Sequence, residues 1–191
     1  MLGLNYMAWL GLLVWVVVPL LAVLVATLLS CRAKSSLKKV LALALGCAIL
    51  SIPALVSNGV KAYYDQQVRE MCAKDGGVRV YETVILPPEM FNKWGQPNFN
   101  IPVTPYIKLK DADKYYLEWE ITNLKSGNPK MERSHFRLIR RSDKKVLGES
   151  VSYSRGGGDL PGPWHGSSFI CPEPTKHEGL ESSIFIKGDK Q

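Results

Sequence analysis

Cys72 and Cys171 are the two cysteines that lie outside the apolar N-terminal third of the chain. Two lone thiols in an oxidising compartment usually form one disulfide. This bond would close a loop of about 100 residues, for which the chain-entropy model gives about 4–5 kcal/mol of stabilisation. We therefore expect a Cys72–Cys171 disulfide, and we expect Cys31 and Cys47 to behave as small apolar residues.

A metal site is the competing use of Cys171. His165 and His177 are evenly spaced on either side of it, and His135 lies elsewhere. The chain has neither a Cys-x-x-Cys nor a His-x-x-x-His pair, the spacings that metal sites commonly use. We therefore expect no metal and no other cofactor.

The loop 154–167, with the sequence SRGGGDLPGPWHGS, suggests an enzymatic alternative. Asp159 and His165, with Ser154 or Ser167, supply the residue types of a nucleophilic triad. A triad is defined by geometry, however, and the loop has no nucleophile-elbow pattern. Its RGGGD stretch also lacks the Lys-Ser/Thr ending of a phosphate-binding loop. We expect no catalytic residues, and an envelope hydrolase that uses this loop is the alternative function.

Aromatic side chains on two long loops, 87–106 and 154–167, indicate a binding surface as another possible function of these loops. Loops of this length inside a small domain are often functional, and aromatic residues are enriched at interfaces. The same rings would serve equally well as lids over a core. The candidate binding surface comprises Phe91, Trp94, Phe99, Asp159, Trp164 and His165.

The periodicity of the apolar residues changes along the second half of the chain. In 61–77 they recur at spacings of three and four before Gly76 and Gly77, which predicts a short stalk helix. From residue 78 onward, alternating runs such as YYLEWEITNL are separated by turn residues, and at least six are candidate strands. We therefore predict a membrane-anchored α+β protein in which 78–191 forms an antiparallel β-rich domain, sandwich-like or a partly open barrel.

Two apolar stretches without charged side chains precede that domain. A bilayer core of about 30 Å needs roughly 20 apolar residues in a helix. We therefore predict a transmembrane helical hairpin over 1–60, with helices over about 7–29 and 40–57 and a cytoplasmic turn over 31–39. Neither helix contains Asp, Glu, Lys, Arg or His, which argues against a pump or a channel.

The charges around the predicted turn indicate its side of the membrane. The turn holds four cations, and the first acidic residue of the chain is Asp65. Short loops with this bias stay in the cytoplasm. A lipoprotein signal ending at Cys31 is the alternative, but the segment before it has no basic region and is longer than the usual apolar core of about 7–15 residues.

The compartment follows from the direction of the hairpin. The N-terminus and the C-terminal domain would both lie on the far side of the membrane from the turn. The chain has no Asn-x-Ser/Thr glycosylation site, which favours a bacterial envelope. We therefore predict a multi-pass protein of the bacterial inner membrane with its N-terminus and C-terminal domain in the periplasm.

Small residues in the second predicted helix indicate where helices pack. The pairs Ala42/Gly46 and Ala44/Ala48 have the small-xxx-small spacing that lets helices approach closely. They would serve either packing inside the hairpin or contact with a partner or a second copy. Both alternatives depend on the same close approach of helices at small residues, so the spacing does not distinguish them.

The charge balance of the domain is close to neutral. Of the 24 Lys and Arg, four lie in the turn, and the remainder exceed the 17 Asp and Glu by only three. Nucleic-acid binding needs clustered cations, so we expect no nucleic acid. The expected partners are the lipid bilayer and either a protein of the envelope or a second copy of the chain.

No motif in the chain specifies a reaction. We therefore expect a non-enzymatic envelope protein, a membrane-anchored extracytoplasmic binding or accessory module that acts on another envelope component. Besides the hydrolase, the remaining alternative is a helical subunit of a larger membrane complex, in which the helices matter more than the domain.

Overall fold

The computed structural model of the protein describes residues 11, 16–32, 35–160, 166–173 and 179–188. The chain divides into two compact units. One comprises Met1–Tyr64 with Gly157–Ser167, and the other comprises Asp65–Gly156 with Ser168–Gln191.

Two apolar helices dominate the first unit. They are α2 (Val18–Arg32) and α3 (Ser36–Asp75), and the 40 residues of α3 include Pro53. Within the described part of the chain, Lys39–Asp75 is the one helix that is long and apolar enough to cross a membrane. The first predicted membrane helix begins near residue 7, so it lies partly outside the described residues.

Small residues let α2 and α3 approach each other closely. Ala42 on α3 is only 5% exposed. A Cβ atom placed on Gly46 would lie 3.2 Å from the Cβ of Ala26 on α2, so a larger side chain would push the helices apart. Ala44 and Ala48 are exposed. Of the two small-residue pairs noted in the sequence, the hairpin buries the first and leaves the second open.

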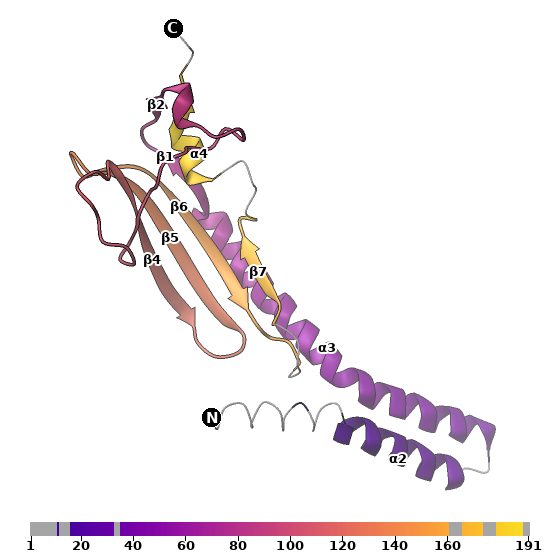
Figure 1. Ribbon diagram of the computed structural model, residues 1–191. Helices are drawn as coiled ribbons and strands as arrows, with labels where there is room; N and C mark the ends of the chain where they lie inside the picture. The colour runs from indigo at the N-terminus through magenta and orange to yellow at the C-terminus, as the bar shows by residue number, and fades with distance from the viewer. Residues whose placement is uncertain (1–10, 12–15, 33–34, 161–165, 174–178, 189–191) are drawn as a thin grey trace. The chain divides into compact units, whose positions relative to one another are not determined.

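The second unit is built on a mostly antiparallel sheet (Figure 1). Its strands follow the order β1-β6-β5-β4-β3, and β7 also pairs with β6. Separately, β2 and β8 form a parallel pair. The elements are β1 (Gly77–Val80), β2 (Val84–Leu86), η2 (Pro88–Met90), β3 (Val103–Thr104), β4 (Tyr115–Lys125), β5 (Lys130–Arg140), β6 (Lys145–Gly156), β7 (Ser168–Cys171), α4 (Leu180–Ile184) and β8 (Phe185–Lys187).

The strand β6 organises the sheet because both of its edges are used. One edge pairs with β5 along its length. The other edge is divided between β1, which pairs with 148–151, and β7, which pairs with 153–156. Since β1 follows α3 almost directly, this arrangement brings the end of α3 next to Cys171, the last residue of β7.

The last part of α3, which belongs to the second unit, covers one face of the sheet. Val68 is completely buried there. Asp75 accepts a hydrogen bond of 2.7 Å from the Tyr153 hydroxyl, and Asp65 accepts one of 2.6 Å from Arg155 Nε. Because Tyr153 and Arg155 are two positions apart on β6, they point to the same face. The apolar stripe of the predicted stalk packs on this face.

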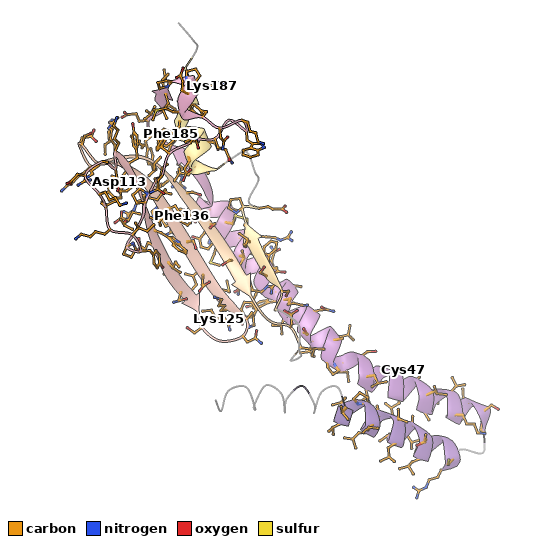
Figure 2. The ribbon with its side chains drawn as sticks, viewed as in Figure 1. Cys47, Asp113, Lys125, Phe136, Phe185 and Lys187 are labelled. Atoms are coloured by element: carbon orange, nitrogen blue, oxygen red, sulfur yellow. A yellow bond between two sulfur atoms is a disulfide. The ribbon has the colours of Figure 1, made fainter. Side chains whose placement is uncertain are left out.

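The opposite face carries the hydrophobic core. The ideal Cβ of Gly148 would lie 2.8 Å from Ile184 Cδ1 and 2.7 Å from the Arg79 carbonyl oxygen, so only glycine fits where α4 and β1 meet β6. Figure 2 shows Phe185, a core residue, at one end of the sheet and Lys125 at the other. The buried core residues are Leu117, Leu138, Leu147, Leu180, Ile184 and Phe185.

The α+β class and the mostly antiparallel sheet agree with the sequence prediction. The observed main sheet is open, however, and differs from the expected sandwich or partly open barrel. The physical reason is that α3 covers one face while α4 and the β2–β8 pair cover part of the other (Figure 1). Helices bury the apolar sides of the strands, so the described residues need no second large sheet.

Candidate binding pocket

The aromatic residues of the loop 87–106 have two different environments. Phe91 and Phe99 pack against the hydrophobic core, and the Phe99 ring lies 5.3 Å from the ring of Phe185. These two act as lids over the core, which was the alternative explanation of the loop aromatics. Trp94 is 67% exposed, with Lys93 Nζ lying 4.3 Å above its ring. The structure therefore does not gather these three rings into one surface.

Asp159 is held firmly in the first unit. The backbone N–H of Ser167 donates to one of its carboxylate oxygens, and Lys61 Nζ lies 2.9 Å from the other. The Ser167 N–H, followed by Lys61, lowers the pKa of Asp159 to about 2. The ionised carboxylate therefore ties the two ends of the loop to α3. Trp164 and His165, which the candidate surface also included, lie outside the described residues.

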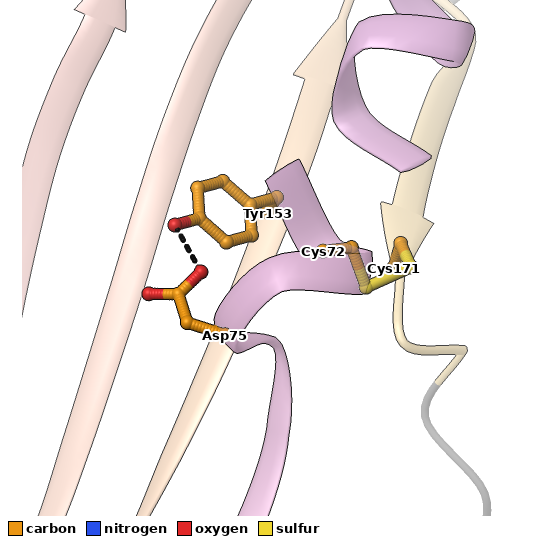
Figure 3. The surroundings of a disulfide bond; sticks show 4 residues. All are labelled: Cys72, Asp75, Tyr153 and Cys171. Carbon is orange, nitrogen blue, oxygen red and sulfur yellow. Dashed lines mark hydrogen bonds between the residues drawn. A yellow bond between two sulfur atoms is a disulfide. The ribbon is translucent and has the colours of Figure 1, made fainter. Parts of the chain in front are cut away.

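The predicted disulfide joins Cys72 on α3 to Cys171 on β7 (Figure 3). Beside it, the Tyr153 hydroxyl donates to Asp75. This hydrogen bond is the largest cause that lowers the pKa of Asp75, and Arg133 adds to it. The disulfide and the ionised Asp75 together fasten the end of α3 to the sheet.

A second polar cluster joins three strands. Glu149 lies 2.8 Å from His135 Nε2 and accepts hydrogen bonds from the Tyr81 hydroxyl at 2.5 Å and from Arg79 at 3.3 Å. These contacts, the one with Tyr81 first, lower the pKa of Glu149. Since the carboxylate already has three partners, the cluster is best explained as a tie between β1, β5 and β6.

A pocket of about 380 Å³ opens on the sheet face that carries the core. This volume is within the range of small-ligand sites. Five parts of the chain form it: the loop before β3, the strand β4, the strand β5, the middle of β6, and the start of α4. The residues that line it are Gln96, Pro97, Leu117, Phe136, Ser150, Gly179, Leu180, Glu181 and Ser182.

An aromatic row leads across the sheet to this pocket. The ring of Tyr106 lies 5.3 Å from that of Trp119, and Trp119 stacks on Phe136 at 5.2 Å with an interplanar angle of 12°. Trp119 and Phe136 are directly paired residues of β4 and β5. Phe136 therefore has Trp119 on one side and lines the pocket itself, which gives the pocket an apolar floor.

Glu181 is the ionisable side chain of the described pocket lining. It is half-buried, and burial raises the pKa of its carboxyl. Across the described ranges, no Lys, Arg or His forms an ion pair with it. An ionised carboxylate in this position has lost water without gaining a cation from the described residues, which costs free energy.

The described lining of the pocket offers one carboxyl group and two hydroxyl groups. Acid–base hydrolysis of the glycosidase kind uses two carboxylates, and the described lining supplies only Glu181. Ser150 and Ser182 offer hydroxyl groups, and the described lining contains no histidine that would pair with them as in a nucleophilic triad. No group of three or more His, Cys, Asp or Glu that could hold a metal ion occurs among the residues that the structure describes.

Comparisons with models of known protein families, with curated proteins and with solved structures gave no significant match. The function therefore has to be argued from the site itself.

The sequence did not reveal this pocket. Its lining residues are spread from Gln96 to Ser182, and neighbouring residues along the chain contribute only at Gln96–Pro97 and at the start of α4. Glu181 is one of 17 acidic residues and lies in no recognisable motif. The alternation of β4 places Leu117 and Trp119 on one face, but it carries no information about Glu181, which joins the pocket from a distant segment.

Proposed function

We propose that the protein is a membrane-anchored binding module that acts on another component of a bacterial envelope. The observation that carries this proposal is the pocket beside Phe136, because it combines an apolar floor with a half-buried carboxylate that has no cation beside it among the described residues. Binding sites are typically apolar cavities with a few convergent polar groups.

The chemistry of the pocket favours a ligand group with a positive charge. An ammonium or guanidinium group would pair with Glu181 and recover the free energy lost through burial of its carboxylate. The aromatic face of Phe136 would add a cation–π contribution. Gln96, Ser150 and Ser182 would fix the orientation of the ligand through hydrogen bonds. A protein partner that presents Lys or Arg fits these requirements.

We propose the finer topology on the basis of the charge pattern and the disulfide. One described helix is long and apolar enough to span a membrane, and the disulfide favours an oxidising compartment. A second span over about 7–29 and the four cations of the 31–39 turn would place the N-terminus and the sheet domain in the periplasm. The protein would then be a multi-pass inner-membrane protein.

The two alternative functions stay predictions. An envelope hydrolase that uses the 154–167 loop would require His165, which lies outside the described residues. The structural ties of Asp159 to Ser167 and Lys61 give that residue a role that needs no catalysis. A helical subunit of a larger complex would keep its function after the sheet domain is removed, and it would lose it if both helices were replaced by an unrelated anchor.

Site-specific cross-linking tests the proposed function. A photoreactive amino acid in place of Ser150 should form an adduct with a partner in intact cells, because Ser150 lines the pocket. Adding Glu181→Gln should strongly reduce the adduct, whereas Glu173→Gln, a matched change at an exposed position, should not. A photoreactive residue at the exposed Glu70 serves as a control for random contact. No adduct at Ser150, or one that is insensitive to Glu181→Gln, would contradict the proposal.

A further inference from the structure

The outer edge of β4 is open over most of its length. The strand runs from Tyr115 to Lys125, but its outer neighbour β3 has only two residues, Val103 and Thr104. These pair with Leu117 and Glu118. Beyond this point β4 pairs only with β5 in the part of the chain that the structure describes.

The peptide groups of this open segment point away from the sheet. The N–H of Leu117 donates to the Pro102 carbonyl oxygen at 2.9 Å, on the side away from β5. Its own carbonyl oxygen accepts a 3.2 Å hydrogen bond from the Thr104 hydroxyl on that same side. Because alternate residues of a strand direct their peptide groups alike, the N–H and C=O groups of Trp119 and Ile121 also point outward. No hydrogen bond to them is formed on this side by described residues.

The side chains along the open edge are of two kinds. On the core-side face, Trp119 and Ile121 follow each other, and Ile121 is 42% exposed. On the other face, the side chains of Glu118 and Glu120 are 44% and 58% exposed. Arg137 lies 3.1 Å from the first carboxylate and 3.6 Å from the second. The Arg137 guanidinium is thus shared by two carboxylates. The face of the edge that carries Glu118 and Glu120 therefore has an excess of negative charge.

We infer that this edge of β4 is a docking site for an extended segment of a partner protein in which basic and apolar residues alternate. The segment would add a strand to the sheet through the outward peptide groups of Trp119 and Ile121. Its basic side chains would lie against Glu118 and Glu120, and its apolar ones would cover Trp119 and Ile121. This surface goes beyond the proposed pocket and does not depend on it.

The charges disfavour a second copy of the chain as the occupant. In an antiparallel β4–β4 pair related by a two-fold axis, both copies present Glu118 and Glu120 on the same face. Like charges that face each other across strands are destabilising, and each copy brings only Arg137 to offset them. A basic segment removes this repulsion.

Peptide binding to the full-length protein in nanodiscs of uncharged zwitterionic lipid tests the inference. The probe is a fluorescently labelled peptide of three Lys-Val repeats, and the comparison peptide has three Glu-Val repeats. We expect the Lys-Val peptide to bind measurably and the Glu-Val peptide to bind at least tenfold more weakly. Absence of Lys-Val binding, or equal binding of both peptides, would overturn the inference.

Substitutions at the edge make the test specific. Ile121→Pro removes one outward N–H without touching the bonds between β4 and β5, as proline at an edge position can. It should weaken peptide binding about tenfold or more, whereas Ile121→Val should leave it unchanged. Because a proline inside a strand can disrupt the fold, the double change Glu118→Lys with Glu120→Lys provides a second test and should also abolish binding.

The remaining outcomes decide against the inference. Unchanged binding in a correctly folded Ile121→Pro variant, judged by its intact disulfide and its aromatic circular dichroism, would show that the peptide binds elsewhere. A concentration-dependent dimer that disappears in Ile121→Pro, without Lys-Val binding by the parent protein, would show that a second copy occupies the edge instead.

Discussion

Glu181 is a residue whose ionised side chain opposes the stability of the fold. Burial raises the pKa of its carboxyl, so the folded protein holds the proton more tightly than the unfolded chain does. The resulting penalty is present above the folded-state pKa and disappears as the pH falls below the ordinary value of about 4.3. A group that weakens the fold at neutral pH is a candidate for a role in binding.

The first prediction concerns this residue. Glu181→Gln should raise the melting temperature at pH 7, because it removes a desolvated negative charge while keeping nearly the same shape. The gain should vanish at pH 3, where the carboxyl is protonated in both states. Thermal unfolding across this pH range measures it. A variant that is less stable than the parent protein at pH 7 would mean that the carboxylate has a stabilising partner.

The disulfide is the second feature at the scale of single residues. Cys72→Ser should lower the free energy of unfolding by about 2–5 kcal/mol, because the unfolded chain gains freedom when the long loop is released. The double change with Cys171→Ser should cost little more, since the two sulfur atoms act as one unit. Chemical denaturation measures both. Fully additive losses would indicate that the thiols stabilise the protein separately.

Individual elements were predictable to different degrees. The alternation in YYLEWEITNL, residues 115–124, predicted β4, observed as Tyr115–Lys125. This signal is local, because side-chain direction alternates along one strand. The sharing of one edge of β6 between β1 and β7 is set by contacts between distant segments, so the alternation within each strand carries no information about it.

The prediction at the scale of elements concerns α2 and α3. Gly46→Leu should disrupt the hairpin, because a Cβ there would already lie 3.2 Å from Ala26. Ala48→Leu should leave it intact, since Ala48 is exposed. The distance between spin labels placed at the exposed positions Leu21 and Leu41, in a background without Cys31 and Cys47, reports the packing. An equal distance in both leucine variants would contradict the observed helix face.

At the scale of the whole molecule, the chain combines a helix that is long and apolar enough to cross a membrane with a sheet domain closed by a disulfide. Composition alone predicted an apolar helix there, since a long stretch without charge is a local property. The two cysteines predicted the bond because no other cysteine lies outside the apolar part of the chain. The pocket required the complete fold, because Gln96, Phe136 and Glu181 meet only after the strands have paired.

The central claim is that the sheet domain lies outside the cytoplasm, since the disulfide and the proposed envelope partner both depend on it. A phosphatase that becomes active only in the periplasm tests this most directly when it is fused either after Gln191 or within the 31–39 turn. We predict activity for the fusion after Gln191 and none for the fusion in the turn. Activity for the turn fusion alone would contradict the claim and would place the sheet domain in the cytoplasm.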